Sequence, residues 1–568
     1  MASLQKVRVQ GHTYWRIVES RRINGKPHAI PLLHLGSADA LLDRLLQAPE
    51  GHLRLRSFRH GDVAALKAVA DRLGIVKIID RHVRRHARQQ SVGVTLLLAA
   101  LNRAARPRSK RGWADWARGT SLERLFPGLN IDAMTSQFFW EQMHRVPQKA
   151  LRAIEDDLTR RVVADLGLKL DTLFYDTTNF FTFIDSTNDR CTVAKRGHSK
   201  QKRFDLRIFG LALLVSRDGQ IPLLSHVYEG NTVDAKIFPS SLTRIRERLE
   251  GLAVDLDDVT LVYDKGNHSR SNQAQVDAAP FGYVASLTPV HHKELLAIPL
   301  DRYRPIGAGT LAKVPVLRRR EEIWGRERTV LLFWSAQLHA GQVRGLHQHL
   351  DKRLAELSAW QQRLAKPRSG PRSLEAVRRR LDKLLSGQHL KKVLHIDYDG
   401  RRKGSNRLRF EVDVAALDHL EREVFGKRLL ITDRHDWSDT EILQAYRGQS
   451  RVEDGFRQLK DDEHCAVRPQ YHWTDQKIHV HTFICLLAFL LGRVVEREAR
   501  SLGYTMGLSG LIDLLGTVRL AMLLSPSGKR GGRPRCTWQL EQGHPEARRL
   551  LRHLVPNKAP FVDTDGTS

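Results

Sequence analysis

The sequence predicts an α/β fold: a mixed sheet flanked by helices, preceded by a mainly helical region and interrupted by an inserted β-rich subdomain. Three observations predict it. Short apolar runs with strand character surround one amphipathic helix between residues 166 and 290. Apolar residues at helical spacing dominate residues 51–165. Hydrophobic residues make up 41% of the chain, which is enough for substantial cores and too much for a disordered chain.

The chain carries a large excess of positive charge. Its 568 residues include 93 Lys and Arg against 63 Asp and Glu, which gives a formal net charge of +30. A solvated surface does not require this excess, whereas a polyanionic partner explains it, and nucleic acid is the usual one. A basic ribosome-associated or membrane-surface protein is the alternative class.

Cysteine usage and hydropathy indicate a cytoplasmic protein. The 4 cysteines are scattered and form no C-x-x-C pair, which favours a reducing compartment over a disulfide scaffold or a zinc ribbon. The N-terminus lacks the apolar segment of a signal peptide. The longest apolar run, Phe483–Leu491, is about half as long as a membrane span, so we expect a buried helix and no membrane.

Two regions precede the predicted sheet. In residues 1–50, Tyr14–Glu19 has strand character and Asn24-Gly25 is a turn signal, so we expect a hairpin. Residues 51–165 are expected to be helical and to bind DNA, and Gly74 is a natural helix stop. This region contains a basic cluster followed by two tryptophans: Arg103, Arg106, Arg108, Lys110, Arg111, Trp113 and Trp116. The cluster is compatible with DNA contacts and equally with a solvated loop before two core tryptophans.

Residues 166–290 predict the first part of the sheet domain. Strands are expected at Leu173–Asp176, Phe204–Val215, Ile221–Tyr228, Val259–Asp264 and Tyr283–Leu287. A helix is expected over Ala235–Leu249, between the third and fourth strands. Three consecutive strands, a helix and two further strands is the order of a ribonuclease-H-like core.

The pattern changes between residues 291 and 437. Two hairpin arms, two helices and two further strand candidates predict an inserted mixed subdomain. Residues 438–500 are expected to complete the sheet domain, with a long helix opened by a Ser438-x-x-Glu441 capping box. Residues 501–568 form a basic C-terminal region, in which Lys529–Arg535 resembles an AT-hook.

Two aspartates mark the ends of predicted strands. Asp176 ends the first strand and Asp264 ends the fourth, and turn-prone polar residues follow each of them. Phosphodiester cleavage uses two divalent cations, and Mg²⁺ or Mn²⁺ prefers carboxylate oxygens. A single aspartate at a strand end is usually a turn former or a helix cap. Two of them, on strands that such a core places side by side, indicate a metal site, whereas Asp185, Asp189 and Asp205 lie off the strand ends.

A third carboxylate is expected from the predicted helix after residue 438. Glu453 lies seven residues after Tyr446 and seven before Lys460, which is nearly two helical turns in each direction. Gln449 and Arg457 lie four residues to either side of Glu453, so all five side chains are predicted on one face. A carboxylate flanked by cations and a phenol suits a phosphate backbone held beside a metal ion. The same spacing also fits a solvated face stabilised by pairs one turn apart.

This helix resembles the signature of DDE insertion-sequence transposases. Tyr446, Glu453 and Lys460 match the family's Y-x2-R-x3-E-x6-K pattern, with Gln449 in place of its arginine. In place of the family's arginine, a phosphate contact is expected from Arg447, Arg451 or Arg457.

The other motifs of the family are also similar to this sequence. Tyr-Asp-Thr-Thr around Asp176 resembles the first acidic motif, and Tyr-Asp-Lys-Gly around Asp264 resembles the second. The segments Arg196–Lys200 and Glu229–Asn231 resemble the family as well, and the similarity spans roughly residues 170–495.

The resemblance implies a ribonuclease-H-like catalytic domain in which Asp176, Asp264 and Glu453 hold two Mg²⁺ or Mn²⁺ ions. It implies an enzyme that binds the terminal inverted repeats of an insertion sequence, cleaves phosphodiester bonds and transfers 3′ ends to target DNA. DNA contacts are implied for Tyr446, Gln449, Arg457, Lys460, Arg196 and Lys200. Both ends must be held together, so a dimer or larger complex on double-stranded DNA is implied, in a bacterial cytoplasm and associated with the nucleoid.

Two other functions fit part of the pattern. A ribonuclease-H-like nuclease without transposition would use the same carboxylates, but the tyrosine–lysine signature and the large insertion favour the transposase. A non-enzymatic DNA-binding protein derived from a transposase should have lost an acidic ligand, and all three are present in this chain.

Overall fold

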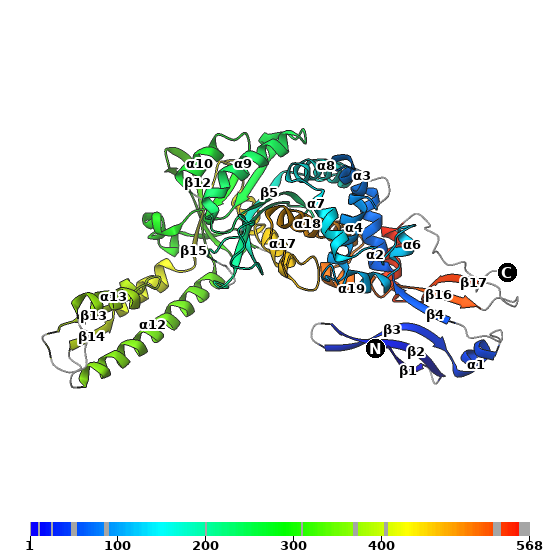
Figure 1. The fold of residues 1–568 in the computed structure, drawn as a ribbon. Helices are drawn as coiled ribbons and strands as arrows, with labels where there is room; N and C mark the ends of the chain where they lie inside the picture. The colour runs from blue at the N-terminus through cyan, green and yellow to red at the C-terminus, as the bar shows by residue number, and fades with distance from the viewer. Residues whose placement is uncertain are drawn as a thin grey trace. The chain divides into compact units, whose positions relative to one another are not determined.

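The computed structural model describes residues 2–9, 12–23, 26–46, 54–84, 90–198, 202–267, 269–307, 311–366, 373–400, 402, 407–525 and 535–555. The Asn24-Gly25 turn, Lys200 and residues 529–534 of the AT-hook-like segment lie outside the described residues. The fold is mixed α/β, with a large mixed sheet flanked by helices (Figure 1). The chain forms two compact units: Met1–Val259 with Ser450–Ser568, and Thr260–Gln449.

The first unit begins with a three-stranded antiparallel sheet in the order β1-β2-β3. Its strands are β1 (Ala2–Val9), β2 (His12–Ile23) and β3 (Lys26–Gly36), followed by α1 (Ala38–Leu46). The predicted hairpin corresponds to β2 and β3. β1 is an additional strand that the sequence did not predict, because its few apolar residues give little alternation.

A helical region follows and surrounds one long buried helix, α18 (Asp475–Ser501). The helices of this region are α2 (Gly61–Arg72), α3 (Ile75–His82), α4 (Val92–Ala105), α5 (Trp113–Arg118), α6 (Leu122–Leu125), α7 (Ser136–His144) and α8 (Gln148–Leu166). α18 packs against α2, α4, α7 and α8 (Figure 1). Among the described residues, one helix, α18, is long and apolar enough to cross a membrane, and 94% of its apolar window is buried inside the protein.

The C-terminal region packs back onto this helical region. It contains α19 (Leu508–Leu515), β16 (Arg519–Ser525), β17 (Arg535–Leu540) and α20 (Pro545–Leu554). β16 pairs with β4 (Arg54–Arg59), in the order β17-β16-β4. The expected basic C-terminal region, residues 501–568, therefore contributes folded elements over Leu508–Ser525 and Arg535–Leu554, in which side chains such as Leu511, Leu520 and Leu550 are fully buried.

Three antiparallel strands of the first unit carry the first acidic motif. They are β5 (Thr172–Thr182), β6 (Arg207–Ser216) and β7 (Pro222–Glu229), followed by α9 (Asp234–Glu250). The three strands and the helix are confirmed, but the predicted end of the first strand is wrong. β5 continues for six residues beyond Asp176, because Thr177, Thr178 and Phe180 are buried and pair with β6.

Six strands of the second unit follow one another in the order β10-β11-β12-β15-β9-β8. They are β8 (Thr260–Tyr263), β9 (Gly282–Ser286), β10 (Arg304–Pro305), β11 (Pro315–Ile323), β12 (Arg326–Trp334) and β15 (Lys427–Thr432). β8 and β9 are parallel and the other pairs are antiparallel. α10 (Arg270–Asp277) connects β8 to β9, and α11 (Lys293–Leu296) and α16 (Asp439–Arg447) are further helices of this unit.

The expected insert, residues 291–437, needs a correction. β12 and β15 lie inside it, yet β15 pairs with both β12 and β9. Val330–Leu332 and Leu429–Ile431 are completely buried, and such strands need cover on both faces, so they belong to the sheet.

Only the middle of the predicted insert forms a module of its own. It contains α12 (Ala336–Ala365), α13 (Leu374–Leu384), α14 (Leu390–Val393), β13 (Leu394–Tyr398), β14 (Leu408–Val412), α15 (Val414–His419) and a π-helix (Leu420–Val424). Its separate core includes Leu357, Trp360 and Leu408. The two predicted helices and the predicted strand pair of this module are confirmed.

We predict opposite effects for two glycine-to-alanine substitutions. A Cβ at Gly230 would lie 1.7 Å from the carbonyl oxygen of Ile208 in β6. Gly230→Ala therefore pushes the backbone at residue 230 away from β6. We expect the free energy of unfolding to fall by about 2 kcal/mol or more. In Gly341→Ala, no atom lies within 4 Å of the new Cβ, and we expect a gain of roughly 0.5–1 kcal/mol from the better helix former. Urea unfolding measures both, and equal stabilities would contradict the packing described at Gly230.

Candidate active site

Asp176 lies in the middle of β5, opposite Leu213 of β6, and its side chain is half-buried. Alternate residues of a strand share one face, so Asp176, Thr178 and Phe180 point to the same side of β5. The acidic group is thus fixed by a paired strand on which its neighbours Thr178 and Phe180 are buried.

The helix that carries Glu453 packs on these strands. α17 (Ser450–Lys460) contacts β5 and β6 through a buried side that includes Val452, Phe456 and Leu459. Its Gly455 allows a close approach to α18, because a Cβ there would lie 3.2 Å from the ring of Phe489. Glu453 itself is exposed.

Lys460 joins α17 to the strand face of Asp176. Its Nζ donates a hydrogen bond to Thr178 Oγ1 at 2.6 Å and lies 5.4 Å from the centroid of the Phe180 ring. Lys460 is two helical turns from Glu453, so both side chains share one side of α17. The structure therefore brings the helix of Glu453 and Lys460 against the strand of Asp176 within one unit.

The predicted single helix through Tyr446 and Glu453 is wrong. The capping box at Ser438 and Glu441 is present, but α16 ends at Arg447, before α17 starts. The N–H of Gly448 donates to the carbonyls of Gln444 and Ala445, which tightens the last turn and ends the helix. The shared face is therefore lost for Tyr446, and Gln449, which is 6% exposed, is buried in the break between the two helices.

In the second unit, Asp264 and Tyr446 lie close together. Asp264 directly follows β8, as predicted, and α16 packs against β8 and β9. The Tyr446 hydroxyl accepts a hydrogen bond from Arg428 of β15, and the ring packs on Phe333 at 6.0 Å between centroids. Burial raises the pKa of Tyr446, and the Asp264 carboxylate adds to this rise while Arg428 opposes it. The phenol is thus held inside the second unit, not presented at the surface.

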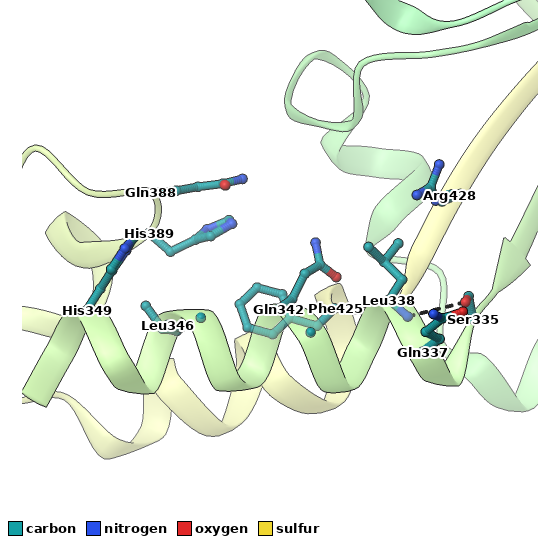
Figure 2. Close-up of a pocket in the computed structure, with 12 residues that line it drawn as sticks. Ser335, Gln337, Leu338, Gln342, Leu346, His349, Gln388, His389, Phe425 and Arg428 are labelled. Carbon is teal, nitrogen blue, oxygen red and sulfur yellow. Dashed lines mark hydrogen bonds between the residues drawn. The ribbon is translucent and has the colours of Figure 1, made fainter. Parts of the chain in front are cut away.

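Arg428 was missed by the sequence analysis. The one sequence feature that could have singled out Arg428 is the charged pair Lys427-Arg428 at the start of an apolar strand. Arg428 also lines one end of a cavity of about 590 Å³ that runs along α12 (Figure 2). Gln388 and His389 lie at the far end of this cavity, and Gln342 between the two ends (Figure 2).

The two glycine-containing motifs that flank the first strands pack against each other. Gly230 N–H donates to Val193 O at 3.0 Å, and Lys195 pairs with Glu229 at 2.7 Å. A Cβ at Gly197 would lie 2.7 Å from Gly230 O, so glycine is required for this approach.

The segment that carries Arg196 is also tied to β5. Asn179, three residues after Asp176, donates to the carbonyl of His198 at 3.1 Å. Arg196, two residues before His198, is exposed.

The neighbouring acidic residues have local partners. Asp454 pairs with the exposed Arg457 at 2.8 Å, so Arg457 is held beside Glu453 on α17. Asp205 pairs with Arg203 at 2.7 Å, and Asp185 accepts hydrogen bonds from the backbone and side chain of Thr187. These are local contacts within loops or within α17.

The three predicted metal ligands are carboxylates, whose oxygens suit Mg²⁺ or Mn²⁺. Half-buried Asp176 and exposed Glu453 belong to the first unit, and half-buried Asp264 to the second. All three offer hard oxygen donors that solvent can reach, as a site that keeps water ligands needs. Across the residues that the structure describes, no group of three or more His, Cys, Asp and Glu side chains is arranged to hold a metal ion.

Comparisons with known proteins show no family for this chain. No protein-family model matches the sequence, and no curated protein matches it. Among solved structures, the chain is similar to a cryo-EM structure of a piggyBac transposase synaptic complex with hairpin DNA. The TM-score is 0.38 and the sequence identity 9%, over 91% of this chain and 90% of the other. A similarity of this size does not show a shared fold.

We predict that the hydroxyl of Tyr446 stabilises the second unit. Tyr446→Phe keeps the ring on Phe333 but leaves a buried hydrogen bond from Arg428 unmade, so the free energy of unfolding should fall by roughly 1–3 kcal/mol. Tyr398→Phe is the matched control, since the Tyr398 hydroxyl has no hydrogen-bond partner within the described part of the chain and its ring only stacks on Trp360. Urea unfolding of both variants measures the difference, and an equal effect would show that the Arg428 contact is dispensable.

Proposed function

We propose that this protein is a DDE-type transposase of an insertion sequence, which cleaves and joins DNA with divalent metal ions. The observation that carries the proposal is the contact between α17 and β5. It holds Lys460 of the signature helix on the same strand face as Asp176 of the first acidic motif. Two motifs that are far apart in the sequence thus occupy neighbouring positions, as a common active site requires.

Asp176, Asp264 and Glu453 are the proposed ligands of two Mg²⁺ or Mn²⁺ ions. Two such ions supply activation of the attacking oxygen and stabilisation of the leaving oxygen in phosphodiester chemistry. Asp176 is fixed by the β5–β6 ladder, and Asp264 lies directly after a completely buried strand. Their positions are therefore set by rigid elements, as a metal site needs.

Lys460 and Arg196 are the proposed phosphate contacts next to the metal ligands. Lys460 is a cation on the strand face of Asp176, and Arg196 is exposed on the segment tied to Asn179 of the same strand. Lys200 is proposed on the sequence resemblance alone. Buried Gln449 and Tyr446 are less suited to direct DNA contact than the sequence suggested, whereas exposed Arg457 keeps that role.

The substrate proposed is double-stranded DNA, namely the terminal inverted repeats of the element and a target site. The net charge of +30 supports a polyanionic substrate. The enzyme would act in the bacterial cytoplasm, associated with the nucleoid. It would act as a dimer or larger complex, because both ends of the element must be joined together. A ribonuclease-H-like nuclease without strand transfer is the alternative that uses the same residues, and detection of joined products separates the two.

Glu453→Gln tests the catalytic assignment. The substitution keeps the size and polarity of the side chain but removes the negative charge that a metal ion needs. We expect cleavage and joining of a fragment from the element's end, in Mg²⁺ or Mn²⁺, to disappear. Binding of the same fragment in a gel shift should persist or strengthen, since repulsion from phosphate is relieved.

The matched control is Asp454→Asn, the same kind of change at the next residue of α17. Asp454 pairs with Arg457 on the exposed side of the helix, so its loss should change stability by less than about 1 kcal/mol and leave cleavage near the parental rate. If Glu453→Gln cleaves as fast as Asp454→Asn, Glu453 is not a metal ligand and the catalytic assignment fails.

Lys460 is expected to act through its charge. Lys460→Ala should weaken binding of the end fragment roughly tenfold and lower cleavage in proportion, with an unchanged dependence on metal concentration. Lys460→Arg keeps a cation that can reach phosphate and should retain most of the binding. Gel shift and cleavage assays on one fragment measure both effects, and equal binding by the two variants would remove Lys460 from the DNA contacts.

A further inference from the structure

The basic cluster at residues 103–111 divides into inward and outward side chains. Arg103 is buried and donates to the carbonyl of Ala466 at 3.2 Å, and Lys110 Nζ lies 3.0 Å from His472 Nε2. Trp113 and Trp116 are also buried, so they are core residues and not stacking platforms for bases. Arg111 is exposed. Arg106 and Arg108 are exposed as well, and the proposed catalytic chemistry uses neither of these two.

These two arginines line a pocket of about 480 Å³ in the first unit. Three more arginines line it from elements far away in the sequence: Arg21 of β2, Arg59 of β4 and Arg519 of β16. The carboxylates in the lining are Glu19 and Asp115. The lining therefore holds five arginines and two carboxylates.

Several of these charges are already compensated within the protein. Arg59 donates to the buried Asp62 at 2.5 Å, and Arg21 pairs with Glu19 at 2.7 Å. Asp115 pairs with Arg118 at 3.0 Å, outside the pocket. The acidic side chains of the lining therefore do not neutralise Arg106 or Arg108, and neither arginine forms an ion pair with any described residue.

The backbone that carries Arg106 and Arg108 is fixed in place by a buried amide. Asn102 is 2% exposed; its Nδ2 donates to the carbonyl of Arg106 at 3.0 Å, and its Oδ1 accepts from the N–H of Arg108 at 3.1 Å. Arg106 precedes a proline and is extended, with φ −165° and ψ 94°. In an extended segment, residues two apart point to the same side, which sends both guanidinium groups toward the pocket.

We propose that this pocket binds phosphate groups of a DNA backbone through Arg106 and Arg108. A guanidinium group offers a planar set of N–H donors that matches two phosphate oxygens, and it is the side chain best suited to that contact. The proposal rests on the proposed function in taking DNA as the source of the phosphates.

The electrostatics of the cluster support an anionic occupant. Desolvation lowers the pKa of Arg106, and the charges of Arg108 and Arg59 lower it further. Desolvation also lowers the pKa of Arg519; the carboxylates of Glu541 and Glu19 oppose this, and the charges of Arg21 and Arg59 add to it. The arginines thus repel one another, and a phosphate in their midst relieves the repulsion. The one aromatic side chain of the lining, Trp116, is buried and offers no platform for base stacking, so we expect the contact to be to the DNA backbone.

The test is binding of a random-sequence DNA duplex, measured by fluorescence anisotropy over a series of salt concentrations. The full-length Arg106→Ala/Arg108→Ala variant should bind roughly tenfold to a hundredfold more weakly than the parent at low salt. The slope of log affinity against log salt should decrease in magnitude by about 2, which is the loss of two phosphate contacts. Unchanged thermal unfolding of the variant shows that the fold is intact.

The matched control is Arg549→Ala/Arg552→Ala, which removes the same charge from exposed positions of α20 in the same unit. The salt slope of this control should differ from the parental slope by less than about 0.5. Parental affinity and slope in the Arg106/Arg108 variant, or an equal loss in the control, overturns the pocket as a phosphate site.

The cleavage assay with Glu453→Gln separates this pocket from the proposed function. If Glu453→Gln abolishes nicking while the Arg106/Arg108 variant binds duplex like the parent, the transposase proposal stands and the pocket fails. If the Arg106/Arg108 variant loses duplex binding while Glu453→Gln still nicks, the pocket stands and the catalytic assignment fails.

Discussion

The first unit depends on the burial of α18. This helix is apolar on nearly all sides and has to be covered completely, with each buried Leu or Phe contributing roughly 1.5–3 kcal/mol. The helices α2, α4, α7 and α8 cover part of it, and β7 and α17 cover another part. Because α17 is held against α18 through Gly455 and Phe489, its position over β5 follows from the same packing. The proposed active site is therefore anchored to the long buried helix of the first unit.

The two cations buried on α18 have contacts inside the unit. Arg493 pairs with Glu496 inside the unit and lies 4.9 Å from the Phe489 ring centroid, and the Lys477 ammonium donates to the carbonyl of Trp140. A buried charge without such contacts would be costly. The charged side chains of α18 are thus accommodated within its packing. Other arginines, such as Arg106, lie at surfaces and pockets.

The three proposed metal ligands differ in their structural support. Asp176 sits within a paired strand, Asp264 directly follows one, and Glu453 projects from a helix that begins at the boundary between the two units. Tyr446 lies on the other side of that boundary, where Arg428 and Asp264 surround it. The signature residues, which are close together in the sequence, are therefore divided between two units. Tyr446 is buried in the second unit, and Lys460 lies on the strand face of Asp176 in the first.

Local signals in the sequence determined most of the secondary structure. The runs around residues 207–216 and 222–229, the helix from residue 234 and the capping box at Ser438 were predicted, because periodicity and end signals act within a few residues. Asp264 after its strand was predicted for the same reason. The metal-ligand role of the three carboxylates stays a prediction.

Only the tertiary structure decided where β5 ends, where the signature helix breaks and which arginines meet. β5 extends past Asp176 because β6 offers partners for ten residues, and that pairing is invisible in the segment itself. The helix breaks at Gly448, where the chain passes from one unit to the other. Arg106 and Arg519 share a pocket although they are far apart in the chain. Contacts over such separations arise from the packing of whole elements, which no local pattern encodes.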